Sequence, residues 1–149
     1  MATTPDKQLW DAAREGDLNA VLEALSQGAN INARGEFGDT ALNLAAEHGH
    51  VEVIERLLEA GADIENLGGA DKTPLMNATF AGHSSSVQLL LDRGALVSRS
   101  LLSSLQMKVS ILEENAEAGM VNPAAAEAWR RFLEFMVKTW QEQTSNEPA

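Results

Sequence analysis

The sequence predicts an all-α solenoid of three tandem repeats with a C-terminal antiparallel helical hairpin as its cap. Two observations predict this fold: residues recur at a spacing of 33 up to residue 98, and two longer amphipathic patterns replace the recurrence beyond it. Three repeats are therefore expected over about 6–38, 39–71 and 72–98, and a capping helix pair over 99–142. A flexible N-terminus over 1–5 and a disordered tail over 143–149 complete the expected organisation.

The spacing of 33 is clearest between the second and third repeats. It relates Thr40 to Thr73, Leu42 to Leu75, Gly49 to Gly82, His50 to His83, and Gly61 to Gly94. One step back, it reaches Leu9, Ala12, Ala13, Gly16 and Gly28. Small, apolar and glycine positions that match across three blocks indicate a tandem array, in which each unit buries its apolar face against its neighbours.

Each repeat is predicted to form two short helices. In the second repeat, Thr40 is the N-cap of the first helix, and Gly49 allows the chain to reverse. In the third repeat, Pro74 suits the first helical position, where no backbone N–H is needed. Gly61 stands where a left-handed residue ends the second helix. That helix has its apolar residues at helical spacing, namely Val53, Ile54, Leu57 and Leu58.

These residues resemble the ankyrin repeat, which implies helix–turn–helix units joined by hairpin fingers. The segment DTALNLAAEHGHVEVIERLLEAGADIEN matches the family pattern at most of its fixed positions, and KTPLMNATFAGHSSSVQLLLDRGALV matches it more loosely. LWDAAREGDLNAVLEALSQGANIN is similar to the first repeat that caps such arrays. One motif departs from the family: the histidine of Thr-Pro-Leu-His is replaced by Trp10, Asn43 and Met76. The inter-repeat hydrogen-bond network of that histidine is therefore called into question.

The cluster of Glu47, His48 and His50 raises the question of a metal or acid–base site, because carboxylates and imidazoles bind zinc and exchange protons. The repeat favours a structural interpretation. His50 falls on the Gly-His turn, where its equivalents are His83 and Asp17, and is expected to make local hydrogen bonds at a helix start. His48 falls on a surface-variable position with no convergent partner in the sequence. No metal site and no cofactor are predicted.

Residues 99–149 lack the repeat and predict two longer helices. The first begins at Ser98 or Ser100, ends at Gly119 and has the stripe Leu102, Leu105, Val109, Leu112 and Ala116. The second begins at Asn122-Pro123 and has the stripe Trp129, Phe132, Leu133, Met136 and Trp140. The pair is interpreted as a lid over the third repeat. Phe135 lies outside the stripe, and either belongs to a wide buried face or marks a partner or self-association surface.

Composition and motifs exclude several classes of function. The start MATTPDKQLW is not a secretory signal, and no run of 18 apolar residues could span a membrane. The net charge of −11 disfavours nucleic acid as a partner. No cysteine is present, so disulfides and thiolate chemistry are excluded, and a reducing compartment is allowed. The cytoplasm is the expected location. Neither a phosphate-binding loop nor a hydrolase motif appears, and the chain is not expected to be an enzyme.

The resemblance implies protein binding on a rigid, concave surface of fingers and first helices. Phe37 and Phe80 are the expected anchors, unless they pack within the finger and the helix. A neutral or basic protein segment is the expected partner. Two alternatives stay open: a structural or self-associating protein that uses the surface around Phe135, and a small metal-binding enzyme. The family's variable positions correspond here to Glu36, Phe37, Asp39, Leu44, Glu47, His48, Gly69, Ala70, Lys72, Asn77 and Phe80.

Overall fold

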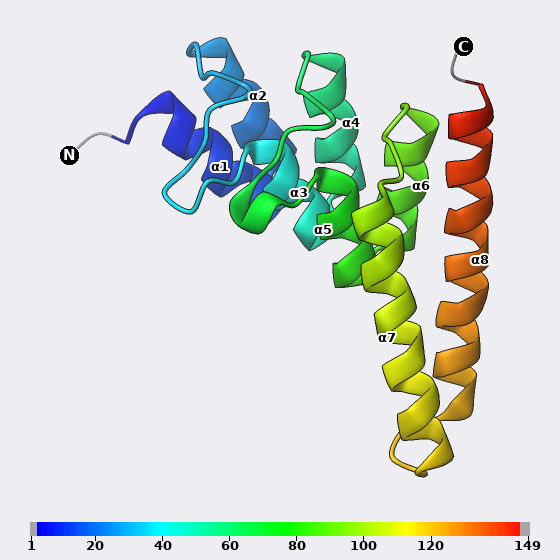
Figure 1. Ribbon diagram of the computed structural model, residues 1–149. Coiled ribbons are helices and arrows are strands. Elements are labelled where there is room, and N and C mark those ends of the chain that lie inside the picture. Colours follow the sequence, from blue (N-terminus) through cyan, green and yellow to red (C-terminus); the bar gives the residue numbers. More distant parts are fainter. Residues whose placement is uncertain (1–2, 147–149) are drawn as a thin grey trace. The chain divides into compact units, whose positions relative to one another are not determined.

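The computed structural model describes residues 3–146, and every regular element within this range is a helix (Figure 1). The chain divides into two compact units, of which the first ends at Ala95 and the second begins at Leu96. We call them the repeat unit and the hairpin unit. This architecture confirms the predicted all-α fold. The division lies close to residue 98, where the sequence repeat stops.

Each repeat is a pair of helices, and the pairs stack along the chain. The first helices pack side by side in one layer, and the second helices form another layer (Figure 1). The pairs are α1 (Pro5–Glu15) with α2 (Leu18–Ser26), α3 (Ala41–His48) with α4 (Val51–Glu59), and α5 (Pro74–Ala81) with α6 (Ser84–Asp92). A short 3-10 helix, η1 (Gly69–Asp71), precedes α5.

Threonine side chains cap the first helices, as the sequence predicts. The Thr40 hydroxyl accepts a hydrogen bond from the Asn43 N–H at 3.3 Å, and the Thr73 hydroxyl accepts one from the Met76 N–H at 3.2 Å. Pro74 occupies the first turn of α5. These bonds satisfy backbone donors that have no partner inside the helix.

The first helix begins earlier than predicted. Thr4 caps α1 by accepting a hydrogen bond from the Lys7 N–H at 3.3 Å, and Pro5 is the first helical residue. The segment expected to be flexible, 1–5, thus overlaps the start of this helix at Thr4 and Pro5, whose residue types suit an N-cap and a first helical position. Residues 1 and 2 lie outside the described residues.

Leucine and alanine side chains fill the core of the repeat unit. Leu9, Leu42 and Leu75 recur at the repeat spacing, and each is at most 1% exposed. Small buried residues allow the first helices to approach one another closely. These small residues are Ala12, Ala13, Ala41, Ala45, Ala46 and Ala78.

One histidine joins the second repeat to the first, and another joins the third repeat to the second. The His50 Nε2 lies 2.8 Å from the Arg14 carbonyl oxygen, and the His83 Nε2 lies 3.0 Å from the Glu47 carbonyl oxygen. Because a carbonyl only accepts, Nε2 carries the hydrogen in both rings. Neither histidine caps its own helix, whereas the Asp17 carboxylate does so through the Ala20 N–H. The structural interpretation of His50 holds, but its bond reaches the preceding repeat and is not local.

Glycines make room for these two imidazole rings. A Cβ placed on Gly16 would lie 2.5 Å from the His50 Nδ1, and a Cβ on Gly49 would lie 2.5 Å from the His83 Nδ1. Gly82 is the third equivalent, and a Cβ there would meet nothing within 4 Å. All three glycines have positive φ and end a first helix.

Asn43 forms hydrogen bonds between repeats at the position of the motif histidine that this chain lacks. Its Nδ2 lies 3.1 Å from the Lys72 carbonyl oxygen and 3.1 Å from the Asn77 Oδ1. Its Oδ1 accepts a hydrogen bond from the Thr40 hydroxyl at 2.8 Å. The side chain is only 1% exposed, so these bonds satisfy an amide that water cannot reach. The amide therefore links the second repeat to the third.

Trp10 has the corresponding role in the first repeat. Its indole N–H donates to the Ala33 carbonyl at 3.0 Å, 23 residues further along the chain. Asn43 reaches the Asn66 carbonyl across the same separation, at 3.5 Å. Met76 is the third equivalent, and a thioether cannot donate a hydrogen bond.

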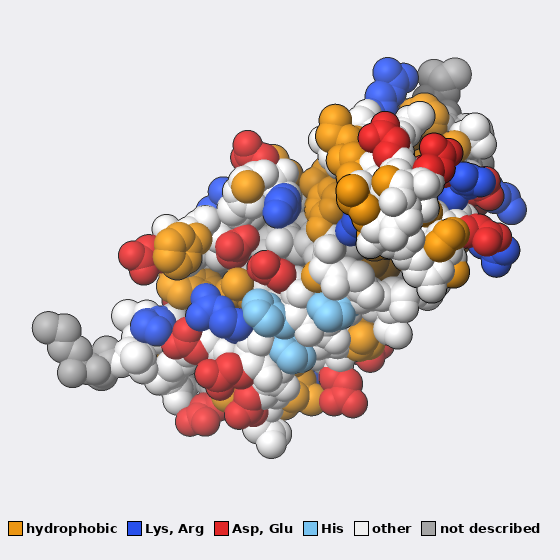
Figure 2. Space-filling model, turned by 90° about the horizontal axis from the view of Figure 1, so that it is seen from below, with side chains coloured by type: hydrophobic (Ala, Val, Ile, Leu, Met, Phe, Trp, Pro, Cys, Tyr) orange, Lys and Arg blue, Asp and Glu red, His pale blue; other side chains and the backbone are white. Residues whose placement is uncertain are grey.

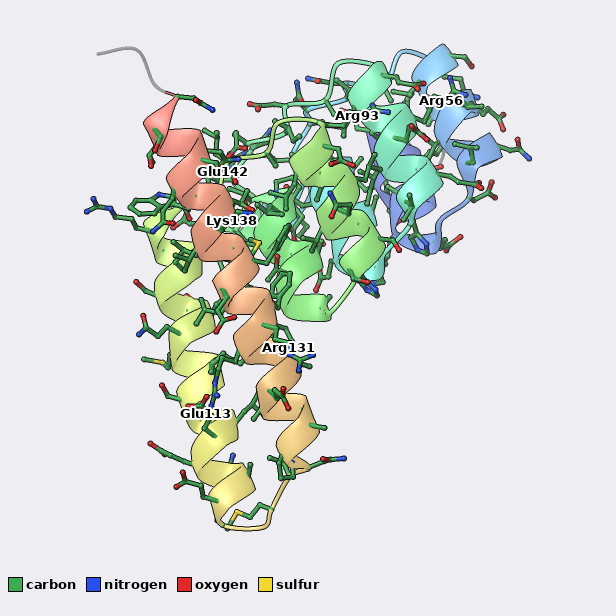
Figure 3. All side chains as sticks on the ribbon, turned by 90° about the vertical axis from the view of Figure 1, so that its right-hand side faces the viewer. Arg56, Arg93, Glu113, Arg131, Lys138 and Glu142 are labelled. Atoms are coloured by element: carbon green, nitrogen blue, oxygen red, sulfur yellow. The ribbon has the colours of Figure 1, made fainter. Side chains whose placement is uncertain are left out.

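The hairpin unit consists of α7 (Arg99–Glu117) and α8 (Pro123–Ser145), which pack against each other. Ser98 caps α7 and Asn122 caps α8. The Arg130 Nε donates a hydrogen bond to the Glu113 Oε1 across the pair at 2.7 Å. This hydrogen bond raises the pKa of Arg130 above its usual value. Figure 3 labels Glu113 on α7. The antiparallel hairpin is thus present as predicted, whereas its role as a lid stays a prediction.

The buried stripe of α7 runs through Leu101, Leu105 and Val109, one residue away from the predicted start at Leu102. These three are spaced four apart, which keeps them on one face. In α8, Met136 is 0% exposed. The other members of its predicted stripe are half-buried, namely Trp129, Phe132, Leu133 and Trp140.

The helix α8 also continues three residues past the expected boundary at 142. The Ser145 hydroxyl donates to the Gln141 carbonyl at 2.7 Å, and the Thr144 hydroxyl donates to the Trp140 carbonyl at 3.0 Å. These bonds satisfy carbonyls at the helix end. The helix thus extends into the expected tail at residues 143–145, and the last three residues of the chain lie outside the described range.

The glycine–histidine packing leads to a matched stability prediction. Gly49→Ala and Gly82→Ala both force alanine into the left-handed region, at a cost of about 1–2 kcal/mol. Gly49→Ala also crowds the His83 ring, which adds about 1–3 kcal/mol. Urea unfolding should therefore show a clearly larger loss for Gly49→Ala. Equal losses would mean that the ring moves aside freely.

The Asn43 network predicts energetic coupling between repeats. Removing one partner leaves a buried polar group unsatisfied, so Asn43→Ala should lower the free energy of unfolding by about 2–3 kcal/mol. Asn77→Ala removes the amide on the other side. A double-mutant cycle of the two changes should give a coupling of about 1 kcal/mol. Additive losses would show that the pair does not join the repeats energetically.

Candidate protein-binding surface

Two turns, here called the fingers, project between the repeats. The first finger spans residues 35–39 and is closed by a hydrogen bond from the Gly35 N–H to the Asp39 carbonyl at 2.9 Å. The second spans residues 68–72 and is closed by the equivalent bond from Gly68 to Lys72 at 2.8 Å. Within the described residues the fingers contain no strand. They are tight turns that keep their shape through backbone bonds.

The two fingers are also joined to each other. The Asp39 Oδ1 accepts a hydrogen bond from the Gly69 N–H at 2.8 Å. A Cβ on Gly69 would lie 2.8 Å from the Phe37 carbonyl oxygen, so only glycine permits this approach. Ala70 and Asp71 adopt left-handed φ values of 56° and 54°, which are unfavourable for residues with side chains. The second finger is therefore held in one conformation by its neighbour.

The predicted contact residues differ widely in exposure. Phe37 is 78% exposed at the first fingertip, whereas Leu44 and Asn77 are each 7% exposed and leave little surface for a partner. Exposed positions are Glu36, Phe37, Glu47, His48 and Ala70, and half-buried positions are Asp39, Gly69, Lys72 and Phe80.

Two of the predicted residues pair with each other. The Lys72 Nζ lies 5.9 Å from the centre of the Phe80 ring, within the range of a cation–π contact. This contact covers part of the Phe80 ring, so the packing alternative for Phe80 has support. Phe37 has no such cover and remains the better anchor.

The histidines gather on one face (Figure 2). The His48 ring stacks on His50 with 6.1 Å between centres, and the His48 Nδ1 lies 3.0 Å from the Leu44 carbonyl oxygen. No group of three or more His, Asp or Glu side chains in residues 3–146 is arranged to hold a metal ion. Nor does this part of the chain contain a helix long and apolar enough to cross a bilayer.

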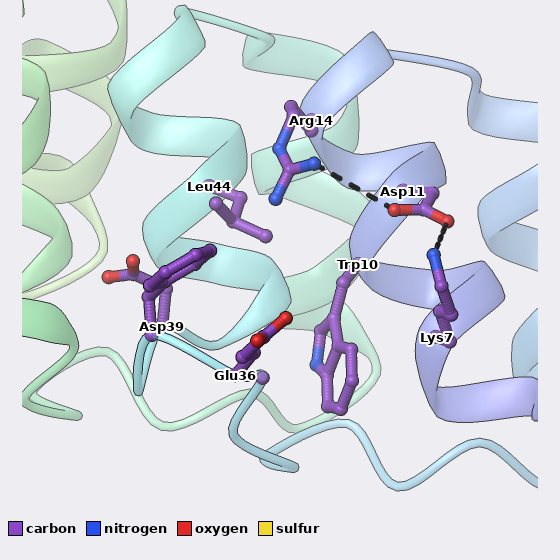
Figure 4. Close-up of a pocket in the computed structure, with 9 residues that line it drawn as sticks. Lys7, Trp10, Asp11, Arg14, Glu36, Asp39 and Leu44 are labelled. Atoms are coloured by element: carbon purple, nitrogen blue, oxygen red, sulfur yellow. Dashed lines mark hydrogen bonds and ion pairs between the residues drawn. The ribbon is translucent and has the colours of Figure 1, made fainter.

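A hollow of about 220 Å³ lies between α1, the first finger and α3 (Figure 4). Glu36, Phe37, Asp39 and Leu44 belong to the predicted contact set and line it. The sequence analysis missed its other side chains, which all come from α1, namely Lys7, Trp10, Asp11 and Arg14. One signal was available: Trp10 is a large aromatic at a position where the other repeats have asparagine and methionine.

A family model described as ankyrin repeats in three copies matches residues 9–100. That segment covers more than half of the 149 residues, and it includes α1 from residue 9 onward, the other five repeat helices and both fingers. A search of curated proteins found no match to the chain. The helix pairs, the glycine turns and the inter-repeat bonds agree with this match. The chain therefore belongs to the ankyrin repeat family.

Proposed function

We propose that the repeat unit binds a protein segment of neutral or basic character across its two fingers and first helices. Ankyrin repeats are generally protein–protein interaction modules and are typically not enzymes. The observation that carries the proposal is the exposure of Phe37, which is 78% on a fingertip closed by backbone hydrogen bonds. An exposed aromatic side chain on a rigid backbone turn can contribute strongly to binding, because ordering the turn costs little conformational entropy.

Charge supports the basic character of the partner. Residues 1–98 contain 15 acids and 6 bases, a net charge of −9. Glu36 and Glu47 are exposed beside the proposed surface. Acidic side chains around an apolar anchor speed association with a positive partner, and salt screens this effect.

The hairpin unit supports a second candidate function, self-association. It exposes Met107 at 68%, Ile111 at 51% and Phe135 at 42%. The Phe135 ring lies 6.3 Å from the half-buried Phe132 ring, so the two form an aromatic pair on α8. Exposed apolar surface of this kind favours contact with another chain.

The finger proposal predicts separable kinetic effects on the partner recovered from the source cells. Glu36→Gln with Glu47→Gln should slow association about 3–10-fold at low salt and flatten its salt dependence. Phe37→Ala should speed dissociation about 10–100-fold, with little change in association. The rates are measured by surface plasmon resonance at several salt concentrations. We avoid Asp39 as a charge variant because its carboxylate also holds the second finger.

Glu23→Gln with Glu52→Gln is the matched control, because it removes the same charge from exposed positions on the second helices. Binding that is unaffected by both Phe37→Ala and the Glu36 and Glu47 changes would exclude the fingers as the site.

Self-association predicts concentration-dependent sedimentation of the full chain. Wild type should form dimers in the micromolar range, and Phe135→Ser should shift the midpoint at least ten-fold upward. Leu67→Ser is the control, since Leu67 is 43% exposed in the repeat unit, almost the same fraction as Phe135. A wild-type chain that stays monomeric up to the highest soluble concentration would remove this candidate.

A further inference from the structure

The hollow between α1, the first finger and α3 has the size of a pocket for one side chain. Its volume is about 220 Å³, and Trp10, Phe37 and Leu44 supply its apolar lining. A cavity of about 150 Å³ already holds a benzene molecule. The hollow is therefore large enough for a phenylalanine, leucine or methionine side chain.

The Trp10 ring is fixed with part of its surface uncovered. Its indole N–H donates to the Ala33 carbonyl at 3.0 Å, which sets the orientation of the ring. Gly35 lies beside it, where an added Cβ would be 3.4 Å from the Trp10 Cδ2. Because glycine has no side chain, this part of the ring stays open to the hollow. Asn43 has the equivalent position in the second repeat and is only 1% exposed, so an open aromatic surface here is particular to the first repeat.

The charges around the hollow are unevenly distributed. On the α1 side, Asp11 pairs with Lys7 at 2.7 Å and with Arg14 at 3.8 Å, so one carboxylate faces two cations and this side keeps a net charge of +1 (Figure 4). On the finger side, the Asp39 carboxylate accepts the Gly69 N–H. Within residues 3–146, the Glu36 carboxylate has no hydrogen-bond or ion-pair partner. A cation that arrives with a ligand therefore has Glu36 as its available counter-charge.

We propose that the hollow binds one large apolar side chain of the partner, and that a lysine or arginine next to it pairs with Glu36. This inference rests on the proposed function and adds the sequence that the partner presents: an apolar residue flanked by a base. The apolar side chain removes the exposed Trp10 and Phe37 surfaces from water, and the base selects against acidic segments.

The test is an NMR titration of the full, ¹⁵N-labelled chain with three short peptides. N-acetyl-Lys-Phe-Lys-amide has both features, N-acetyl-Glu-Phe-Glu-amide reverses the charge, and N-acetyl-Lys-Gly-Lys-amide lacks the apolar side chain. The chain has three tryptophans, and Trp10→Phe assigns the Trp10 indole signal. We expect a saturable shift of this signal with the first peptide, at least five-fold weaker binding of the second, and no saturation with the third.

Two variants test the hollow and its charge separately. Gly35→Leu fills the hollow from a position that has no left-handed φ, and should abolish the shift of the indole signal. Glu36→Gln should bring the affinities for the first two peptides within two-fold of each other. Ser103→Leu adds a similar apolar group at an exposed position of α7 and should bind like wild type. Thermal melting checks the folding of each variant, and the peptide selectivity of Glu36→Gln carries the test if Gly35→Leu is unfolded.

Two results would overturn the inference: equal binding of the basic and acidic peptides to wild type, or undiminished binding to folded Gly35→Leu. The proposed function fails on different evidence. A partner that dissociates faster from Phe37→Ala yet binds Gly35→Leu normally would exclude the hollow and leave the finger surface as the site. A partner that is insensitive to all finger variants would exclude both.

Discussion

The repeat unit depends on polar groups that one repeat leaves unsatisfied and the next repeat satisfies. The carbonyls of Arg14 and Glu47 lie at the ends of first helices, where no helical N–H remains for them. A histidine of the following repeat donates to each. Asn43 makes equivalent bonds in the opposite direction along the chain. The Asn43 amide is buried, so separating the second repeat from the third would leave it without these partners, whereas the two histidine bonds are exposed to water. Stacking of the repeats is therefore needed above all for the buried network.

The same dependence extends to the proposed binding surface. The fingers are short and contain no strand within the described residues, so they have little stability of their own. Asp39 gives the second finger a fixed neighbour by accepting the Gly69 N–H at 2.8 Å. Asn43 holds the base of the same finger through the Lys72 carbonyl. The buried Asn43 therefore helps to fix the position of the exposed second finger. In this way, packing between repeats can preorganise a surface for a partner.

Much of the fold could be predicted because its signals are local. Thr40, Gly49 and Pro74 act within a few residues of their own position, and their capping and turn roles are confirmed. The inter-repeat bonds could not be predicted in the same way. His50 was expected to bond locally like Asp17, but its ring reaches the preceding repeat. A shared position in a repeat fixes the location of a side chain, and not its hydrogen-bond partner.

The candidate surface was predicted less completely for a related reason. Alignment to variable positions does not measure burial, so it included Leu44 and Asn77, which are each 7% exposed. It also omitted Trp10, because that position is a fixed motif position of the family and not a variable one. Only the three-dimensional arrangement shows that the indole both bonds to the Ala33 carbonyl and borders a hollow.

One recurring position has a different residue in each repeat, and this difference affects how one repeat can be joined to the next. Trp10, Asn43 and Met76 occupy this position in turn, and only the first two side chains can donate to a following loop. One step of 33 beyond His83 is Ala116, which has no ring to contact the end of α5. The third repeat thus lacks the donor that would hold a following finger, and the three repeats are not equivalent at this position. A duplicated third repeat would bring its own histidine to the open Gly82 turn, but Met76 would give it no bond of the Trp10 or Asn43 kind.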